Sequence, residues 1–164
     1  HSVKAGIISD INALLETYPT AEILVTGHSL GAAVSLLCAV DVASTVSNSL
    51  KLYNFGEPRV GNPSFSTWAA SVLPSHKQYR VTHAADPVPH LPPLDKGFIH
   101  CPHEVWYDNN GDHSYKRCND SPTHEDPHCS DSVLAPVDVY DHVEYLGKCT
   151  NCETHKNFFG HCPV

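Results

Sequence analysis

The sequence predicts an α/β fold in which a mostly parallel sheet is flanked by helices. Two observations favour this class: apolar runs typical of buried strands alternate with segments of helical periodicity, and turn-forming residues separate them. The 164 residues are enough for one domain with a core, and no apolar run approaches the length of a membrane span.

Three helices are predicted. The first covers residues 3 to about 18, because apolar residues recur at helical spacing before Pro19, which helps to end it. Pro63 suits the first turn of the third helix, which runs to about residue 72. The second helix, from 30 to about 46, is expected to place four residues on or near its inner face: Ala33, Val34, Leu37 and Cys38.

The predicted strands cover residues 22–26, 51–55 and 78–82, with a shorter one at 104–107. The first is continuously apolar, and a strand of that type needs a neighbour on each side and helices on both faces. The chain begins at His1, contains no Met and supplies no earlier strand. We therefore expect an absent N-terminal segment of a longer precursor to complete the sheet, because a bare edge would invite aggregation.

Composition narrows the partners and the compartment. The formal net charge of −8 disfavours nucleic acid and anionic membrane surfaces and suits a neutral substrate. The seven cysteines stand in a chain rich in Pro and loops, which is typical of an oxidising compartment. We expect a secreted, extracellular protein.

The residues from 23 to 33 contain the most informative motif. They read as a strand, a G-x-S-x-G turn around Ser29 and a helix, which is the context that identifies a nucleophile elbow. Gly27 and Gly31 lack a Cβ, which would let a strained backbone fit and let the helix approach the strand. The alternative is an ordinary turn with a surface serine.

A serine nucleophile needs a base, and the base needs an orienting acid; in α/β hydrolases the chain order is Ser, Asp or Glu, then His. Asp86 follows a predicted strand, where functional residues are often delivered, although an Asp before proline also starts turns. His142 is one candidate base near the C-terminus, and His155 and His161 are others. Spacing alone leaves this choice open.

Four blocks of sequence follow one another in a characteristic order: residues 26–32 (TGHSLGA), 53–62 (YNFGEPRVGN), 80–83 (RVTH) with 86–93 (DPVPHLPP), and 142–145 (HVEY). Together they resemble the class 3 lipase family, which includes filamentous-fungal triacylglycerol lipases and feruloyl esterases. The resemblance covers about residues 1–147 and implies the C-terminal part of an α/β-hydrolase domain, leaving residues 148–164 as a Cys-rich tail.

The resemblance implies Ser29 as nucleophile, Asp86 as acid and His142 as base, with the Leu30 N–H as one oxyanion donor. In the family, the second donor and the lid lie in the N-terminal half. The resemblance therefore implies a partner, the N-terminal chain of the same enzyme, and an isolated fragment is the alternative. No metal or organic cofactor is expected.

Apolar residues around the acid and the base are expected to line the acyl pocket, since each buried methylene gives about 0.8 kcal/mol. Ordinary core packing is the alternative for them. The candidate substrate-binding residues are His28, Val88, Leu91, Val137 and Val139.

Cys118 and Cys129 bracket a polar excursion and are expected to form a disulfide. The tail cysteines are also expected in disulfides, one of which would bridge to the absent N-terminal piece; a zinc site is the alternative there. Those residues are Cys149, Cys152 and Cys162, with His161 as a further candidate zinc ligand. A metal-like group is instead expected in a solvated loop: His124, Glu125, Asp126 and His128.

The resulting hypothesis is a secreted carboxylic-ester hydrolase, foremost a triacylglycerol lipase that forms an acyl-enzyme and touches lipid interfaces transiently. Feruloyl esterase is one alternative, and a non-catalytic lipase-like binding protein is another.

Overall fold

The computed structural model describes residues 3–46, 49–73, 76–108 and 114–150. The helices are α1 (Lys4–Thr17), α2 (Leu30–Thr45), α3 (Pro63–Val72) and α4 (Val139–Val143). The strands are β1 (Ile23–His28), β2 (Leu50–Phe55), β3 (Gln78–His83), β4 (Glu104–Tyr107), β5 (Lys116–Arg117), β6 (Glu144–Tyr145) and β7 (Lys148–Cys149). Short 3₁₀ turns lie at Val88–His90, Leu94–Lys96 and Ser130–Ser132.

The main sheet has five strands in the order β1-β2-β3-β4-β5. The first four are parallel, and the short β5 is antiparallel to β4. The predicted fold class, α/β with a mostly parallel sheet, is therefore confirmed. Sequential parallel strands need crossovers, which α2 and α3 supply in the first two connections.

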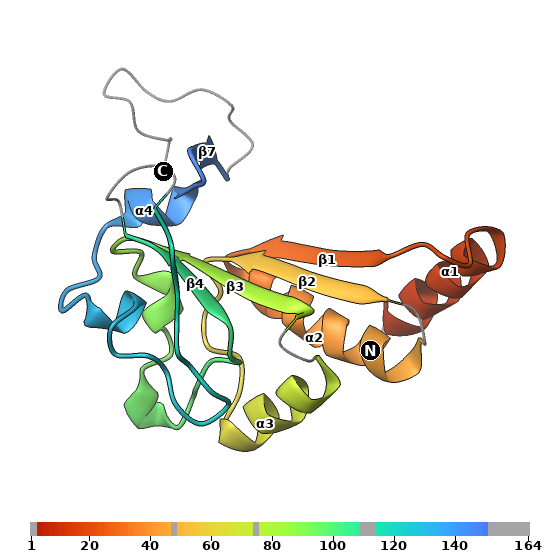
Figure 1. The fold of residues 1–164 in the computed structure, drawn as a ribbon, viewed down its shortest axis with the longest axis horizontal. Helices are drawn as coiled ribbons and strands as arrows, with labels where there is room; N and C mark the ends of the chain where they lie inside the picture. Colours follow the sequence, from red (N-terminus) through yellow and green to blue (C-terminus); the bar gives the residue numbers. More distant parts are fainter. Residues whose placement is uncertain (1–2, 47–48, 74–75, 109–113, 151–164) are drawn as a thin grey trace.

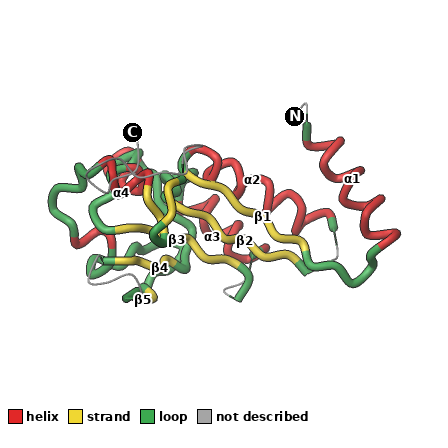
Figure 2. Tube along the Cα trace, turned by 90° about the horizontal axis from the view of Figure 1, so that it is seen from above, coloured by secondary structure: helices red, strands yellow, loops and turns green. Residues whose placement is uncertain are grey.

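The helices cover the sheet unevenly. Figure 1 shows α2 and α3 on the same side of the sheet, whereas α1 lies at one end. Figure 2 shows that α1 stands away from the sheet, next to α2. None of the described helices is both long and apolar enough to cross a membrane.

The main core lies between α2, α3 and the face of the sheet that they cover. Strand residues alternate between the two faces, so Leu50 and Leu52 point into this layer while Tyr53 stacks on Tyr79 on the other face. The buried core residues are Leu36, Ala39, Val40, Val42, Val46, Leu50, Leu52, Ala69, Leu73 and Cys101.

The predicted inner face of α2 was wrong for Val34 and Leu37, whereas Cys38 packs against the core as predicted. Val34 and Leu37 are 57% and 45% exposed, whereas Leu36 and Val40 are buried. The helix is apolar almost all round, so its periodicity does not distinguish the face that packs on the sheet from the face that does not. The chain therefore presents an apolar stripe on the outer side of α2.

The C-terminal elements were not predicted. β5, β6 and β7 have two residues each and α4 has five, which is too short for a periodic signal. β6 and β7 form an antiparallel hairpin around Gly147, whose φ is +71°. This hairpin spans the expected boundary between residues 147 and 148, and the division into a domain and a tail stays a prediction.

Candidate active site

Ser29 lies at a sharp turn between β1 and α2. Its φ of 58° and ψ of −130° are strained for a residue with a side chain, as a nucleophile elbow requires. A Cβ on Gly27 would lie 2.2 Å from the Gly31 carbonyl oxygen, so only glycine fits there. Gly31 was expected to need glycine too, but a Cβ there meets nothing within 4 Å among the described residues. Close approach therefore depends on Gly27.

Three side chains from distant parts of the sequence meet at this turn. The Ser29 hydroxyl donates to His142 Nε2 at 2.8 Å. His142 Nδ1 donates to the Asp86 carboxylate, at 2.9 Å from Oδ2 and 3.0 Å from Oδ1. A serine, an imidazole and a carboxylate in this order form the geometry of a nucleophile, a base and an orienting acid.

Asp86 follows β3 and is 2% exposed. Its Oδ1 accepts from the Val88 N–H at 2.8 Å and its Oδ2 from the Tyr145 hydroxyl at 2.5 Å. Burial and the Asp86 carboxylate raise the pKa of Tyr145 well above its ordinary value, so the hydroxyl keeps its proton. These donors offset the cost of burying the Asp86 carboxylate.

Gly56 leaves the space in which these groups meet. Its φ is +58°, and a Cβ there would lie 3.0 Å from the Tyr145 hydroxyl, 3.1 Å from Asp86 Oδ2 and 3.2 Å from His142 Cε1. A side chain at this position would press on the acid and the base together.

His28 packs behind the base. Its Nε2 donates to the His142 carbonyl at 2.7 Å, and the two rings lie 4.6 Å apart. Burial lowers the pKa of His28, which favours a neutral ring beside His142. These contacts make His28 a support for His142, and its expected role in substrate binding stays a prediction.

The loop after Asp86 is held from below by Arg59. Its guanidinium donates to the carbonyls of His90 at 2.8 Å and Pro92 at 3.1 Å, and its backbone N–H donates to the Leu91 carbonyl at 2.7 Å. The same guanidinium forms a two-point ion pair with Glu125, with both distances 2.8 Å. These bonds fix the path of the chain directly after the acid.

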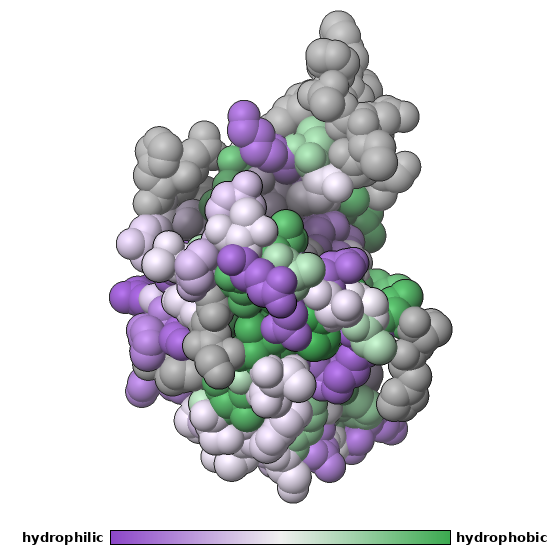
Figure 3. All heavy atoms as spheres, turned by 90° about the vertical axis from the view of Figure 1, so that its right-hand side faces the viewer, coloured by the Kyte–Doolittle hydropathy of each residue, from purple (hydrophilic) through white to green (hydrophobic). Residues whose placement is uncertain are grey.

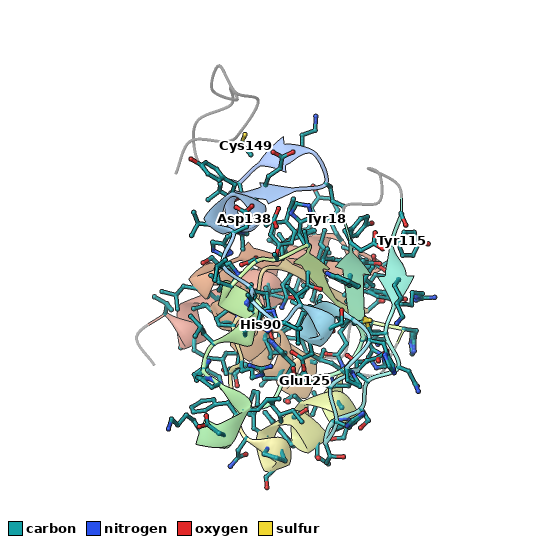
Figure 4. All side chains as sticks on the ribbon, turned by 90° about the vertical axis from the view of Figure 1, so that its left-hand side faces the viewer. Tyr18, His90, Tyr115, Glu125, Asp138 and Cys149 are labelled. Atoms are coloured by element: carbon teal, nitrogen blue, oxygen red, sulfur yellow. A yellow bond between two sulfur atoms is a disulfide. The ribbon has the colours of Figure 1, made fainter. Side chains whose placement is uncertain are left out.

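The expected solvated loop at residues 124–128 was therefore wrong for its acids. The Glu125 side chain is 6% exposed and Asp126 is also buried. In Figure 4, Glu125 and His90 fall within the outline of the molecule, whereas Tyr115 lies at its edge. A charged segment looks solvated in sequence, but Arg59 gives Glu125 a buried partner.

The expected Cys118–Cys129 disulfide is confirmed. Among the described residues, the one cluster with metal-ligand spacing is Glu104 with these two cysteines, and their disulfide removes both thiolates as ligands. Cys149 is also disulfide-bonded, and a tail bridge to the N-terminal piece stays a prediction. Cys152, Cys162, His155 and His161 lie outside the described residues.

The other candidate residues surround the triad in sequence and are open to solvent. Leu30 opens α2 and is 74% exposed, and its N–H belongs to the first turn of the helix, where donors lack intrahelical acceptors. Leu91, Val137 and Val139 are 52%, 76% and 48% exposed, and Val88 is half-buried. Their roles in binding stay predictions.

Sequence reasoning missed Tyr145, Arg59 and Glu125. Tyr145 and Arg59 stand inside blocks that carry the family resemblance, which was a usable signal. Glu125 had none, because its partner is 66 residues away.

Comparison with known proteins identifies the family in which this geometry occurs. The profile of the family described as "Lipase (class 3)" matches residues 1–96. A lipase of Rhizomucor miehei is 35% identical over 149 residues, which is 88% of this chain and 40% of that protein. The secreted mono- and diacylglycerol lipase A of Penicillium cyclopium is 38% identical over 63% of this chain and 33% of its own length.

The fold agrees with solved structures as well. A triacylglycerol lipase with a catalytic centre described as a serine protease triad superposes with a TM-score of 0.79 and 35% identity, over 90% of this chain and 56% of that one. The chain thus spans less than half the length of the curated relatives described above. The profile match, the identity to these lipases and the shared fold show that the chain belongs to the class 3 lipase family.

Proposed function

We propose that this chain is the triad-bearing part of a secreted carboxylic-ester hydrolase, foremost a triacylglycerol lipase. The observation that carries the proposal is the continuous relay from Ser29 through His142 to Asp86, with distances of 2.8 and 2.9 Å. Lipases named as such are its relatives, and no relative described above is a feruloyl esterase.

The relay provides each proton transfer of a two-step hydrolysis. Ser29 Oγ attacks the ester carbonyl as its proton moves to His142 Nε2, and the oxyanion accepts a hydrogen bond from the Leu30 N–H. The tetrahedral intermediate collapses, and His142 gives that proton to the leaving alcohol. Water, deprotonated by His142, then attacks the acyl-enzyme, and the proton returns to Ser29 as the acid leaves. Asp86 holds the ring and stabilises the imidazolium throughout.

A second polypeptide segment is part of the proposal. β1 pairs with β2 on one side, and Leu24 on β1 is 61% exposed. On the outer side of α2, Leu30, Val34 and Leu37 are exposed as well. Lipases of this family are longer than this chain, so we infer that their N-terminal segment covers this region and supplies the second oxyanion donor and the lid.

The extracellular location rests on two supports. The Cys118–Cys129 disulfide is stable in an oxidising compartment, and the Penicillium cyclopium relative is named a secreted enzyme. We further propose that Val88, Leu91, Val137 and Val139 contact the acyl chain, because they flank the acid and the base in sequence and all but the half-buried Val88 are exposed.

The decisive experiment combines labelling and substrate choice. The chain assembled with its N-terminal segment should react with a fluorophosphonate probe at Ser29, and Ser29→Ala should abolish labelling and hydrolysis without loss of the fold. Turnover of Ser29→Ala near the wild-type rate would contradict the nucleophile. p-Nitrophenyl palmitate should be hydrolysed faster than methyl ferulate, and the reverse order would replace the lipase with a feruloyl esterase. A folded assembly that fails to label would instead support a non-catalytic binding protein.

A further inference from the structure

The segment that carries the base is bonded to the peptide that precedes the acid. The Ala85 N–H donates to Asp141 Oδ2 at 2.9 Å, and the Ala85 carbonyl accepts from the Asp138 N–H at 3.3 Å. Ala85 is the neighbour of Asp86, and Asp141 is the neighbour of His142. Both backbone polar groups of Ala85 thus tie the α4 segment to the acid loop, one residue away from Asp86.

The two sides of this connection differ in how firmly they are held. The end of β3 is anchored by β4, because the Ala84 N–H donates to the Tyr107 carbonyl at 2.7 Å and the Trp106 indole donates to the Ala84 carbonyl at 3.2 Å. α4 has five residues, and a helix of that length is unstable by itself. The position of the base therefore depends on contacts with the anchored loop.

Asp141 makes the side-chain contact of this kind. Its side chain is 14% exposed, with Oδ2 on the Ala85 N–H and Oδ1 3.8 Å from His83 Nδ1. His83 Nδ1 also lies 3.0 Å from the Asp141 carbonyl, to which it donates when that nitrogen is protonated. Asp141 thus contacts both His83 and Ala85, through its side chain and its backbone.

We propose that Asp141 is a positioning residue that sets the register of His142 against Asp86. The inference rests on the proposed function and deepens it. What matters is an acceptor oxygen at the Ala85 N–H, because this bond fixes the helix turn from which His142 projects. The negative charge is not required, so an amide oxygen in the same place serves equally well.

This distinction separates two variants of one residue. Asp141→Asn keeps an oxygen for the Ala85 N–H, and its kcat should stay within about threefold of wild type. Asp141→Ala removes the acceptor, and kcat should fall about 10- to 100-fold, the range expected when a reacting group is misplaced by about 1 Å. KM should change less than about twofold, since among the described residues the bonds of the Asp141 side chain go to the acid loop and not to the residues proposed to contact the acyl chain.

Asp138 provides the matched control on the same segment. Its Oδ1 accepts from the Tyr140 N–H and caps α4, but its side chain makes no bond to the acid loop among the described residues. Figure 4 shows it at the start of this helix. Asp138→Ala weakens the helix cap by about 1 kcal/mol. It should nevertheless keep kcat within about threefold, and Asp138→Asn should match wild type.

The measurements are kcat and KM of the chain assembled with its N-terminal segment, with circular dichroism as the folding check. Equal kcat values for Asp141→Ala and wild type would overturn the inference, as would equal losses in Asp141→Ala and Asp138→Ala. An Asn variant as poor as the Ala variant would also overturn it, by showing that the charge is required.

If Asp141→Ala does not fold, Asp141→Glu provides the test. Its extra methylene displaces the acceptor oxygen, so its kcat should lie below that of Asp141→Asn. A higher kcat would overturn the inference. A wild-type assembly that does not label with fluorophosphonate refutes the proposed function itself.

Discussion

The two edges of the main sheet are finished in different ways. At one edge, the short strand β5 pairs with β4, and the Cys118–Cys129 disulfide closes the loop that follows β5. At the other edge, the parallel strand β1 pairs with β2 alone among the described strands. Parallel strands normally have a neighbouring strand on each side and helices on both faces, so β1 resembles an interior strand that lacks one neighbour.

The side chains repeat this contrast. Near β1, apolar residues are exposed, including Leu24 on the strand and Val34 on α2. Figure 3, which views the end of the molecule where α1 lies, shows apolar atoms grouped among polar ones. Near β4, charged residues are buried instead, and Arg80 pairs with Glu104 at 3.4 Å inside the protein. The chain builds its acid-and-base side from its own residues, whereas its nucleophile side presents surface suited to a partner.

The largest expected effect tests the self-sufficient side. Arg59→Ala removes a guanidinium that is 3% exposed and leaves Glu125 buried without its ion-pair partner. The free energy of unfolding, measured with urea at pH 7, should fall by about 3–5 kcal/mol. Lys4→Ala breaks the exposed Lys4–Asp41 pair on the other side, where the side chains are 48% and 42% exposed, and should cost about 1 kcal/mol or less. Equal losses in the two variants would contradict the contrast.

Acid sensitivity should follow from the same buried pair. Burial alone would raise the pKa of Glu125, but its bonds to Arg59 and nearby positive charge lower it from 4.5 to about 2. A depressed pKa in the folded protein gives a stabilisation that is complete above pH 4.5 and is lost as the pH falls towards 2. The loss should reach about 3 kcal/mol.

Glu125→Gln isolates this contribution. The variant should be less stable than wild type at pH 6, and the difference should shrink as the pH is lowered from 4.5 towards 2, in urea titrations at each pH. A difference that stays constant over that range would show that Glu125 does not titrate with folding.

The predictable parts of this molecule are those that local sequence determines. The four parallel strands of the sheet and the elbow around Ser29 were predicted because apolar segments and a glycine-framed turn are visible within about ten residues. The disulfide was predicted from two cysteines 11 positions apart. For each of these features, the residues that form it lie close together in the chain.

Features that depend on distant partners were not predictable in this way. Glu125 looked solvated because Arg59 is 66 positions earlier, and the outer face of α2 looked buried because nearly all of its faces are apolar. The approach of His142 to Asp86, 56 positions apart, was suggested by family resemblance and not by spacing. α4 is too short to show a periodic signal, and its position depends on bonds to Ala85.

The two glycines of the elbow differ in the same way as the two edges: Gly27 is packed against the chain itself, whereas Gly31 is not. Gly27 faces the packed turn, where a Cβ would meet backbone at 2.2 Å, so Gly27→Ala should destabilise the chain by about 1–3 kcal/mol and slow fluorophosphonate labelling. Gly31 faces open space within this chain, so Gly31→Ala should be neutral or stabilising by up to about 1 kcal/mol. Thermal unfolding of both variants provides the measurement. A Gly31→Ala variant as unstable as Gly27→Ala would show that Gly31 is packed as tightly as Gly27.

The smallest effect on stability belongs to the exposed apolar residues near β1. Leu24→Lys and Leu37→Lys alter side chains that are 61% and 45% exposed, so the free energy of unfolding should change by no more than about 0.5 kcal/mol. Because an uncovered strand edge and an apolar surface promote association, both variants should reduce self-association of the isolated chain in light scattering. The same changes should weaken its assembly with the N-terminal segment. Leu134→Lys is the control, since Leu134 is fully exposed away from β1, and a reduction as large in that variant would mean that added charge, and not the uncovered edge, controls association.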